Sequence, residues 1–375
     1  MRLLHLHSSF NAGGKELRAV RLMNLFGGGV SHTVVSAEPN AYAASAAVAK
    51  GVAVSYPQDF PPLTGPFRIG RLHALARAMA GHDLVLTYNW GAMDAVMAHT
   101  LFSQALGLPP LVHHEDGFNE DEALRLKPAR NWYRRIGLGR AAGLIVPSQR
   151  LERIALEVWH QPRWRVRRIA NGIPTAAYAA TPKPDVLPRV IKRKGELWLG
   201  TLAGLRAVKN LPRLVRAFAG LPEEWQLVIL GEGPERETIR EAAIALDIGH
   251  RVHLPGFVAD PARVLGLFDL FALSSDSEQF PISVVEAMAA GLAVAAPAVG
   301  DVAAMVAPEN APFIVAPGRD DSLAEALERL AGDAPLRARI GAANRTRARA
   351  EYDEGAMLAA YRAAYAAALG RETFP

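Results

Sequence analysis

Short apolar runs alternate with amphipathic stretches along nearly the whole chain of 375 residues. The apolar runs of the first half are residues 2–8, 31–38, 84–89 and 144–148. Strands that alternate with helices predict βαβ units and a parallel sheet. The same alternation starts again after residue 190, with runs at 197–203, 225–233 and 251–257. The sequence therefore predicts an α/β protein with two parallel-sheet halves.

The join between the halves is expected near residues 170–178, ANGIPTAAY, where Asn-Gly and Ile-Pro interrupt the pattern. A chain of this length is typical of two domains. Parallel sheets bind ligands at the carboxyl ends of their strands. We therefore expect the two domains to face a central cleft that holds the ligand.

Composition narrows the chemistry. The chain has no cysteine, which excludes disulfides, a thiolate metal site and a cysteine nucleophile. Residues 121–170 carry twelve Lys and Arg against four Asp and Glu, an excess larger than the net charge of +5 of the whole chain. No signal peptide or apolar segment of membrane-spanning length is recognised. The expectation is a cytoplasmic protein with one basic region.

Two glutamates stand eight positions apart in the stretch SSDSEQFPISVVEAMAAG, residues 274–291. Pro281 and Gly291 predict a helix over about 281–290, because proline suits the first helical position and glycine the C-terminal end. The N-terminus of such a helix is a phosphate-binding site. A nucleotide sugar would fit, with a ribose diol at Glu286, phosphates at the helix start and a polar group at Glu278. The alternatives are an acid that favours the helix dipole at Glu278 and a solvent-facing position at Glu286.

The same stretch resembles a known signature. EQFPISVVEAMAAG is similar to the E-x7-E motif of retaining GT-B glycosyltransferases of family four. Further segments resemble that family in the same order: 11–16, 202–210, 229–235, 252–258 and 352–365. The resemblance implies the GT-B fold, with two Rossmann-like domains. Residues 1–172 plus 355–375 would form the acceptor-binding domain with a returning C-terminal helix, and 173–354 the nucleotide-sugar-binding domain.

The resemblance also implies roles for single residues. Glu286 would hold the ribose hydroxyls, Glu278 would contact the donor sugar, and Lys209 would neutralise the diphosphate leaving group. The other donor-binding positions that it implies, through backbone groups near the phosphates and the base, are Gly13, Gly14, Phe257, Val258, Phe280, Pro281, Ile282 and Ser283.

The chain departs from the family pattern at three places. The family's arginine five positions before Lys209 is replaced by Gly204, and Arg206 is the cation that could replace it. Gln279 stands where glycine is usual. Asp116 precedes Gly117 where the family commonly has histidine.

The catalytic position therefore has two candidates. Strand alternation places His114 and Asp116 on one face. We assign Asp116 to the catalytic position, with His114 as the alternative if the register differs. A carboxylate there would stabilise an oxocarbenium-like transition state or assist the acceptor hydroxyl. A cap for the following turn is the structural alternative for Asp116.

The predicted function is retaining transfer of a sugar from a UDP- or GDP-sugar to a glycan or a lipid-linked acceptor. No Asp-x-Asp motif is present, so we expect no metal and no cofactor. One alternative is a dinucleotide-dependent oxidoreductase, since GEGPER at 231–236 begins like G-x-G-x-x-G, but its sixth position is Arg236. Another is a GT-B enzyme that is not a transferase, such as a sugar-nucleotide epimerase.

The basic region supplies a possible surface for a partner. Residues 127–140 mix Arg130, Arg134 and Arg135 with Trp132, and Trp159 and Trp164 accompany the basic run 163–168. Basic helices with aromatic residues suit an anionic membrane surface. We predict peripheral attachment to the inner leaflet through residues 127–168. A solvated face is the alternative, and no nucleic-acid motif accompanies the charge.

Overall fold

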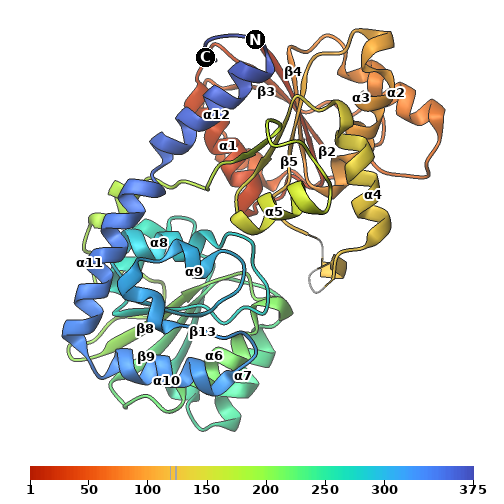
Figure 1. The fold of residues 1–375 in the computed structure, drawn as a ribbon. Coiled ribbons are helices and arrows are strands. Elements are labelled where there is room, and N and C mark those ends of the chain that lie inside the picture. Colours follow the sequence, from red (N-terminus) through yellow and green to blue (C-terminus); the bar gives the residue numbers. More distant parts are fainter. Residues whose placement is uncertain (119, 123–124) are drawn as a thin grey trace. The chain divides into compact units, whose positions relative to one another are not determined.

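The computed structural model describes residues 1–118, 120–122 and 125–375. The chain forms two compact units: in Figure 1 the red-to-yellow residues and the dark-blue C-terminal residues form one, and the green-to-blue residues between them form the other. Unit 1 contains Met1–Asn171 and Met357–Pro375, and unit 2 contains Gly172–Ala356. The division thus lies at 172 and 356, where the sequence led us to expect 173 and 354.

Unit 1 is built on a parallel sheet of seven strands among the described residues, in the order β3-β2-β1-β4-β5-β6-β7. The strands are β1 (Arg2–His7), β2 (Ser31–Ser36), β3 (Ala53–Ser55), β4 (Leu84–Tyr88), β5 (Leu111–His114), β6 (Gly143–Val146) and β7 (Val166–Arg168). The helices are α1 (Gly14–Phe26), α2 (Ile69–Met79), α3 (Met93–Leu106), α4 (Pro128–Gly137), α5 (Gln149–Glu157) and α12 (Glu354–Ala368), which starts in unit 2.

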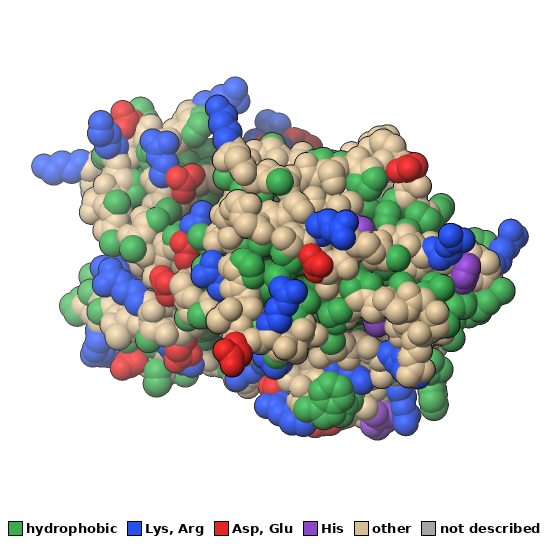
Figure 2. Space-filling view, turned by 90° about the horizontal axis from the view of Figure 1, so that it is seen from above, with side chains coloured by type: hydrophobic (Ala, Val, Ile, Leu, Met, Phe, Trp, Pro, Cys, Tyr) green, Lys and Arg blue, Asp and Glu red, His purple; other side chains and the backbone are tan. Residues whose placement is uncertain are grey.

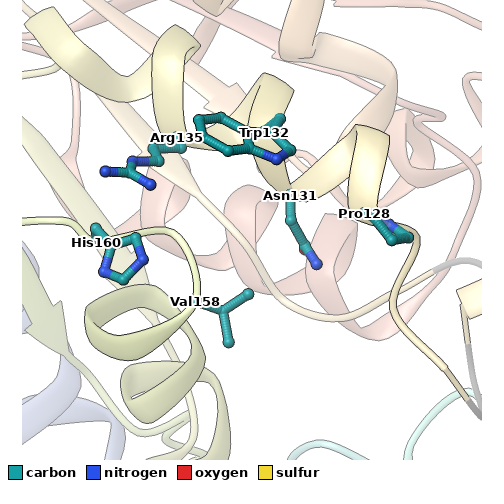
Figure 3. A pocket seen from close by; sticks show the side chains of 6 residues that line it. All are labelled: Pro128, Asn131, Trp132, Arg135, Val158 and His160. Atoms are coloured by element: carbon teal, nitrogen blue, oxygen red, sulfur yellow. The ribbon is translucent and has the colours of Figure 1, made fainter.

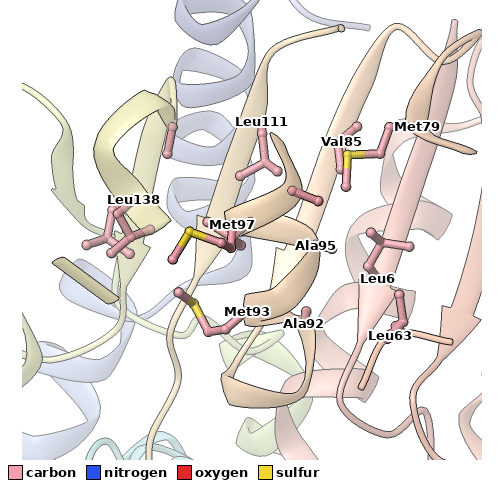
Figure 4. Close-up of a cluster of buried hydrophobic side chains, with 14 of the residues drawn as sticks. Leu6, Leu63, Met79, Val85, Ala92, Met93, Ala95, Met97, Leu111 and Leu138 are labelled. Carbon is pink, nitrogen blue, oxygen red and sulfur yellow. The ribbon is translucent and has the colours of Figure 1, made fainter. Parts of the chain in front are cut away.

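Alternating side chains give this sheet two apolar faces. Leu6 on β1 and Val85 on β4 pack in one cluster with α2 and α3, which Figure 4 shows from close by. Leu3 and Leu86 belong to a second cluster that contains residues of α1 and α12. Each strand alternates its side chains between the two faces, so helices cover both faces of the sheet, as in a doubly wound fold.

Unit 2 contains a parallel sheet of six strands in the described chain, in the order β10-β9-β8-β11-β12-β13. These are β8 (Leu197–Leu202), β9 (Trp225–Leu230), β10 (Val252–Gly256), β11 (Leu270–Ala272), β12 (Val294–Pro297) and β13 (Ile314–Val315). The helices are α6 (Leu211–Phe218), α7 (Arg236–Ala245), α8 (Ile282–Ala290), α9 (Val302–Met305), α10 (Asp320–Ala331) and α11 (Ala334–Glu351). Two Rossmann-like parallel-sheet domains were the expected architecture, and the structure confirms them.

The two ends of unit 2 are fastened to each other. Ile173 and Asp353 form a parallel bridge, in which Ile173 N donates to Tyr352 O at 3.0 Å and Glu354 N donates to Ile173 O at 2.9 Å. Thr175 Oγ1 also donates to Asp353 Oδ2 at 2.6 Å. Both places where the chain leaves unit 2 therefore lie side by side.

Among the described residues, none of the helices combines the length and apolar character that spanning a bilayer requires.

Candidate active site

The helix that carries Glu286 starts one residue later than predicted. Helix α8 begins at Ile282, and Pro281 occupies the N-cap with φ −70° and ψ 106°, an extended conformation. Val284 N makes the first turn's hydrogen bond, to Pro281 O at 3.1 Å. The N–H groups of Ile282 and Ser283 precede it, so they belong to the helix end whose donors ligands or caps satisfy. Gly291 ends the helix with φ 78°, as its sequence position predicts.

Glu278 and Lys209 form an ion pair just before this helix. Lys209 Nζ lies 2.5 Å from Glu278 Oε1, with side chains that are 16% and 11% exposed. Ser275 Oγ donates to the same carboxylate oxygen at 2.7 Å. The segment that carries Lys209 is tied to the strand end by Ser274 Oγ, which donates to Lys209 O at 2.9 Å. Two residues that lie 69 positions apart are thus brought together, as the nucleotide-sugar interpretation requires.

Glu286 is half-buried on the first two turns of α8 and accepts a hydrogen bond from a tyrosine. Tyr178 Oη, from the 3₁₀ helix η5 (Thr175–Ala179), donates to Glu286 Oε1 at 2.9 Å. Burial raises the pKa of Glu286 to about 7, while the hydrogen bond from Tyr178 acts in the opposite direction. The same burial, and then the charge of Glu286, raises the pKa of Tyr178, so the phenol stays protonated. Sequence reasoning missed Tyr178, which lies 108 positions away from Glu286 and belongs to no recognised motif.

The loop after β8, residues 203–210, contains two cationic side chains, Lys209 and Arg206, and Arg206 is the exposed one. Arg206 is exposed at the N-cap of the 3₁₀ helix η6 (Ala207–Lys209), and its guanidinium has no ion-pair partner in the described part of the chain. Gly204 is exposed, and a Cβ there would meet Arg206 Nε at 3.6 Å. Arg206 therefore lies beside Gly204, the position at which the family has its arginine.

Two glycines of the GEGP segment explain why it resembles a dinucleotide motif. A Cβ on Gly231 would lie 1.8 Å from Ala203 O, and one on Gly233 would lie 2.4 Å from Leu205 O. Both glycines have positive φ, 142° and 156°. They let this turn pack against the backbone of the loop after β8, which is a structural reason for G-x-G at this place.

A third glycine, which sequence reasoning missed, supports the glutamate segment. Gly300 has φ 57°, and a Cβ there would lie 2.6 Å from Glu278 O and 2.7 Å from Gln279 O. Asp301 N donates to Gln279 O at 3.1 Å. The backbone at Glu278 and Gln279 is therefore held by the turn after β12 although Gln279 replaces the usual glycine.

The proposed base-binding segment follows β10. Phe257 is 69% exposed, and Val258 is half-buried beside it. Gly256, the last residue of β10, has φ 104° and accepts Gly231 N at 2.9 Å through its carbonyl. The segment thus lies at the same sheet edge as the loop after β8.

In unit 1, Asp116 is clasped by an arginine from α1. Arg18 donates from both terminal nitrogens, Nη1 to Asp116 Oδ1 and Nη2 to Asp116 Oδ2, the latter at 2.9 Å. Arg18 Nη1 also donates to Asn171 Oδ1 at 2.8 Å, and Asp116 N donates to Asn89 Oδ1 at 2.8 Å. Burial alone would raise the pKa of Asp116, but the charge and hydrogen bonds of Arg18 outweigh it and lower that pKa.

His114 is a buried residue of the core. Its Nε2 lies 2.9 Å from Tyr365 Oη, and its Nδ1 lies 3.2 Å from Thr87 O. Burial, and then the charge of Arg18, lowers the pKa of His114 to about 3, so the ring is neutral. Neutral histidine with a carbonyl at Nδ1 carries its proton there and accepts the tyrosine hydroxyl at Nε2. Both nitrogens are thus engaged within unit 1.

The Gly-Gly loop leads into α1. Gly13 is the extended N-cap, and Gly14 is the first residue of the helix. A Cβ on Gly13 would lie 2.6 Å from Glu16 Oε2, and Glu16 is buried and pairs with Lys15. In this structure the group that approaches Gly13 closely is the carboxylate of Glu16.

A cavity of about 490 Å³ opens at the carboxyl edge of the sheet of unit 1. Ser8, Ala37 and Asn89, which line it, directly follow or lie next to the ends of β1, β2 and β4. Lys15 and Glu38 add opposite charges, so this open cavity has hydroxyl, amide and charged groups that could bind a hydroxylated ligand.

The basic region is less uniformly exposed than the sequence suggested. Arg134 is fully buried, with Nε 2.9 Å from Glu115 Oε2, and Trp159 is fully buried with it. Both were expected at a surface, and this expectation was wrong because Arg134 balances the buried acids Glu115 and Glu122. A buried arginine requires such partners.

Other members of the region are exposed. Trp132 is 60%, Ile136 55% and Trp164 67% exposed. Figure 3 shows Trp132 and Arg135 of α4 above a cavity of about 250 Å³, across from Val158 and His160. On the face seen in Figure 2, Lys and Arg side chains are spread among neutral ones and are not gathered into a single patch.

The described residues contain no group of three or more His, Asp and Glu side chains placed to hold a metal ion.

Two family models match the chain. Residues 186–347 match the one described as "Glycosyl transferases group 1", and residues 13–177 match "Glycosyltransferase Family 4". EpsF of Bacillus subtilis is 29% identical over 223 residues, which cover 54% of this chain and 56% of EpsF. LpsD of Rhizobium meliloti, a lipopolysaccharide core biosynthesis glycosyltransferase, is 30% identical over 174 residues, 46% of each protein. The chain spans about half the length of these two relatives.

Solved structures share the fold. The crystal structure of Anabaena HepE in complex with UDP matches with a TM-score of 0.78 at 20% identity, covering 96% of this chain and 98% of that chain. Sucrose-phosphate synthase from Thermosynechococcus elongatus matches with a TM-score of 0.75 at 21% identity, covering 98% of this chain and 100% of that chain. These likenesses show the fold, and the two family models favour the glycosyltransferase over the oxidoreductase alternative, which the G-x-G turn supported.

Proposed function

Because this chain belongs to the GT-B glycosyltransferases of family four, we propose that it transfers a sugar from a nucleoside-diphosphate sugar to a hydroxyl acceptor. The observation that carries the proposal is the Lys209–Glu278 ion pair, which lies directly before the N-terminus of α8, with Glu286 further along the same helix. A diphosphate between the helix end and Lys209 would connect a sugar at Glu278 to a ribose at Glu286.

The donor would be held along α8. The N–H groups of Ile282 and Ser283, which precede the first hydrogen bond of α8, favour a diphosphate, and the exposed Phe257 lies in the segment that would hold the base. We propose a uridine or guanosine donor. HepE has been crystallised with UDP-glucose, which supports testing UDP-sugars first.

Charge on the leaving group would be neutralised by Lys209. When the sugar–phosphate bond breaks, negative charge grows on the diphosphate, and a cation held nearby stabilises it. We propose that Lys209 and the end of α8 supply this stabilisation without a metal ion, and that Arg206 adds to it from its exposed position. Full activity in the presence of EDTA is the expected result.

The transfer is proposed to retain anomeric configuration, with Asp116 at the catalytic position of unit 1. The arginine clasp keeps Asp116 ionised, which suits electrostatic stabilisation of an oxocarbenium-like transition state better than proton abstraction. Neutral, fully engaged His114 suits a structural role instead. Analysis of the product anomer by NMR tests the stereochemistry.

The acceptor is proposed to be a glycan or a lipid-linked saccharide that enters the cavity lined by Ser8, Lys15 and Asn89. For a lipid-linked acceptor, the exposed Trp132, Ile136 and Trp164 with Arg135 and Arg140 would rest on the anionic inner leaflet. Sedimentation with anionic vesicles at low salt tests this. Trp132→Ala/Ile136→Ser should lose binding, Ile244→Ser in unit 2 should keep it, and no binding by the unaltered protein refutes it.

The central experiment measures release of nucleoside diphosphate from a panel of UDP- and GDP-sugars, with and without saccharide acceptors. Thermal stabilisation by UDP or GDP identifies the base, because a ligand of the native state raises its melting temperature. Glu286→Ala and Lys209→Ala should each abolish most turnover. Turnover that both variants leave unchanged would refute the assignment, and epimerised donor without transfer would indicate the non-transferase alternative.

A further inference from the structure

The side chain that touches Glu286 is itself built into the fold. Tyr178 is 5% exposed and comes from η5, which packs against α8. Its hydroxyl donates to Glu286 Oε1 at 2.9 Å. A phenol with a raised pKa acts only as a donor toward a carboxylate, so this hydrogen bond has a fixed direction.

The hydrogen bond from Tyr178 makes the two carboxylate oxygens of Glu286 different from each other. Oε1 of Glu286 already accepts from Tyr178, so Oε2 is the oxygen with both lone pairs available to a ligand. A carboxylate rotamer that is fixed by one partner presents its other oxygen in a constant direction. An unsupported glutamate on a half-buried helix face would instead lose side-chain entropy when a ligand binds.

We propose that Tyr178 is a positioning residue for donor binding: it holds the Glu286 carboxylate in the orientation, and in the ionised form, that accepts the hydroxyls of a ribose. This inference rests on the proposed function, in which Glu286 binds the ribose of a nucleoside-diphosphate sugar. Tyr178 acts through Glu286 and needs no contact with the donor itself.

The surroundings of Glu286 make Tyr178 decisive for its ionisation. Burial raises the pKa of Glu286 to about 7, and Tyr178 is the group that lowers it. Among the other elements packed against α8, η8 (Pro261–Arg263) brings Asp260 at its N-cap, which acts on Tyr178, and Arg263. Helix α11 brings Arg345, which binds Ala290 O at the far end of α8. The segments 265–267 and 294–297 contain no charged residue.

The position of Tyr178 is fixed from the other end of unit 2. Three residues before it, Thr175 Oγ1 donates to Asp353 Oδ2, and Ile173 bridges to the same residue. The orientation of Glu286 is therefore supported through η5 by both ends of unit 2, not by α8 alone.

The test is the pH dependence of nucleotide binding to the full chain. UDP and GDP are titrated calorimetrically from pH 5.5 to 9 into the unaltered protein, Tyr178→Phe and Glu286→Gln. The unaltered protein should lose affinity below about pH 7, and Glu286→Gln should bind weakly at every pH. Tyr178→Phe should show its midpoint about one pH unit higher, the tenfold change expected from one lost hydrogen bond to a charged group.

A matched control removes another buried hydroxyl from the same unit. Tyr352 is 6% exposed, lies next to Asp353 near the last residues of unit 2, and donates to Met305 O at 3.4 Å without reaching Glu286. Tyr352→Phe should keep the midpoint of the unaltered protein. Equal midpoints for Tyr178→Phe and Tyr352→Phe would overturn the inference.

A second measurement separates this inference from the proposed function. Carbon-13 NMR of the glutamate carboxyls, assigned with Glu286→Gln, follows the ionisation of Glu286 without any nucleotide. A higher midpoint in Tyr178→Phe supports the inference even if UDP and GDP fail to bind, in which case the donor assignment falls. An unchanged midpoint of the Glu286 carboxyl in Tyr178→Phe refutes the inference even if both nucleotides bind. A thermal melt of the same sample shows that the variant is folded.

Discussion

Asp116 in unit 1 and Glu286 in unit 2 are both half-buried carboxylates, yet their pKa values are shifted in opposite directions. Asp116 meets a guanidinium, and its pKa is lowered despite burial. Glu286 meets a neutral phenol, and burial raises its pKa to about 7. The comparison teaches that the charge of the partner, not the depth of burial, decides the state of a carboxylate here. Asp116 is locked within its unit, whereas Glu286 keeps capacity for a ligand.

The largest expected effect comes from breaking the clasp of unit 1. Arg18→Leu leaves Asp116 partly buried without its cation, and removal of one partner of a buried pair costs about 3–5 kcal/mol of the free energy of unfolding. Urea unfolding of the full chain measures the loss. Arg77→Leu on the exposed face of α2 is the control and should change stability little. Adding Asp116→Asn should recover part of the loss, and a loss below about 1 kcal/mol would contradict the clasp.

Acid should weaken the two units differently. Burial lowers the pKa of His114 to about 3 and that of His32 to about 4, below the value of about 6.5 in the unfolded chain. The free energy of unfolding that comes from keeping these rings neutral is fully present above pH 6.5. As pH falls below that value, the unfolded chain binds protons that the folded state does not, and about 1.4 kcal/mol per pH unit is lost for each histidine. Glu286 has the opposite sign, because its folded pKa of about 7 lies above the unfolded value and the native state gains stability as pH falls through 7.

Hydrogen exchange of the full chain at pH 7 and pH 5, corrected for intrinsic rates, tests this difference. Protection should fall more in unit 1 than in unit 2. His114→Phe should lower stability at pH 7 but flatten the acid response, whereas His250→Gln, an exposed change in unit 2, should leave it unaltered. An equal loss of protection in both units would refute the prediction.

In unit 2, the main loss should be of turnover and not of stability. Lys209→Ala removes the cation beside Glu278, and loss of one charge-stabilising group typically costs 10²–10³ in kcat, about 2.7–4 kcal/mol. Single-turnover release of nucleoside diphosphate measures it. Lys194→Ala, at an exposed position of the same unit, serves as the comparison variant. A Lys209→Ala enzyme within threefold of the unaltered one would show that Lys209 has no role in the chemistry.

The smallest expected effect concerns Ser275. Its Oγ donates to Glu278 Oε1, and Ser275→Ala should cost about 0.5–1.5 kcal/mol, roughly a 2- to 13-fold drop in kcat/KM. Initial rates with the preferred donor give the value, and Ser322→Ala on α10 provides the background. A rate equal to that of Ser322→Ala would mean that Lys209 alone orients Glu278.

The sequence predicted what depends on local order. The strand–helix alternation and the alternation of side chains along a strand follow from short-range periodicity, and the helix start within one residue of Pro281 follows from the proline. His113 Nδ1 indeed lies 2.8 Å from Thr87 Oγ1, whereas His114 lies against Tyr365. The family resemblance also brought Lys209 and Glu278 into one hypothesis.

What the sequence could not predict depends on contacts between distant residues. Arg18 reaches Asp116 across 98 positions, and Tyr178 reaches Glu286 across 108. Arg134 was expected at a surface because its neighbours are basic, but buried acids from two other segments surround it. Charge pattern along a chain records composition, not which side chains the fold turns inward.

The bridge between Ile173 and Asp353 closes unit 2 as one continuous segment, and this has a consequence for the order in which the two units fold during synthesis. Unit 2 is one uninterrupted segment, whereas unit 1 needs α12, whose Tyr361 and Tyr365 are fully buried in its core. On the ribosome, all residues of unit 2 are therefore synthesised before the last segment of unit 1, although unit 1 begins first. Unit 1 must wait for α12, and the apolar surface that α12 will cover stays exposed until that helix has been synthesised.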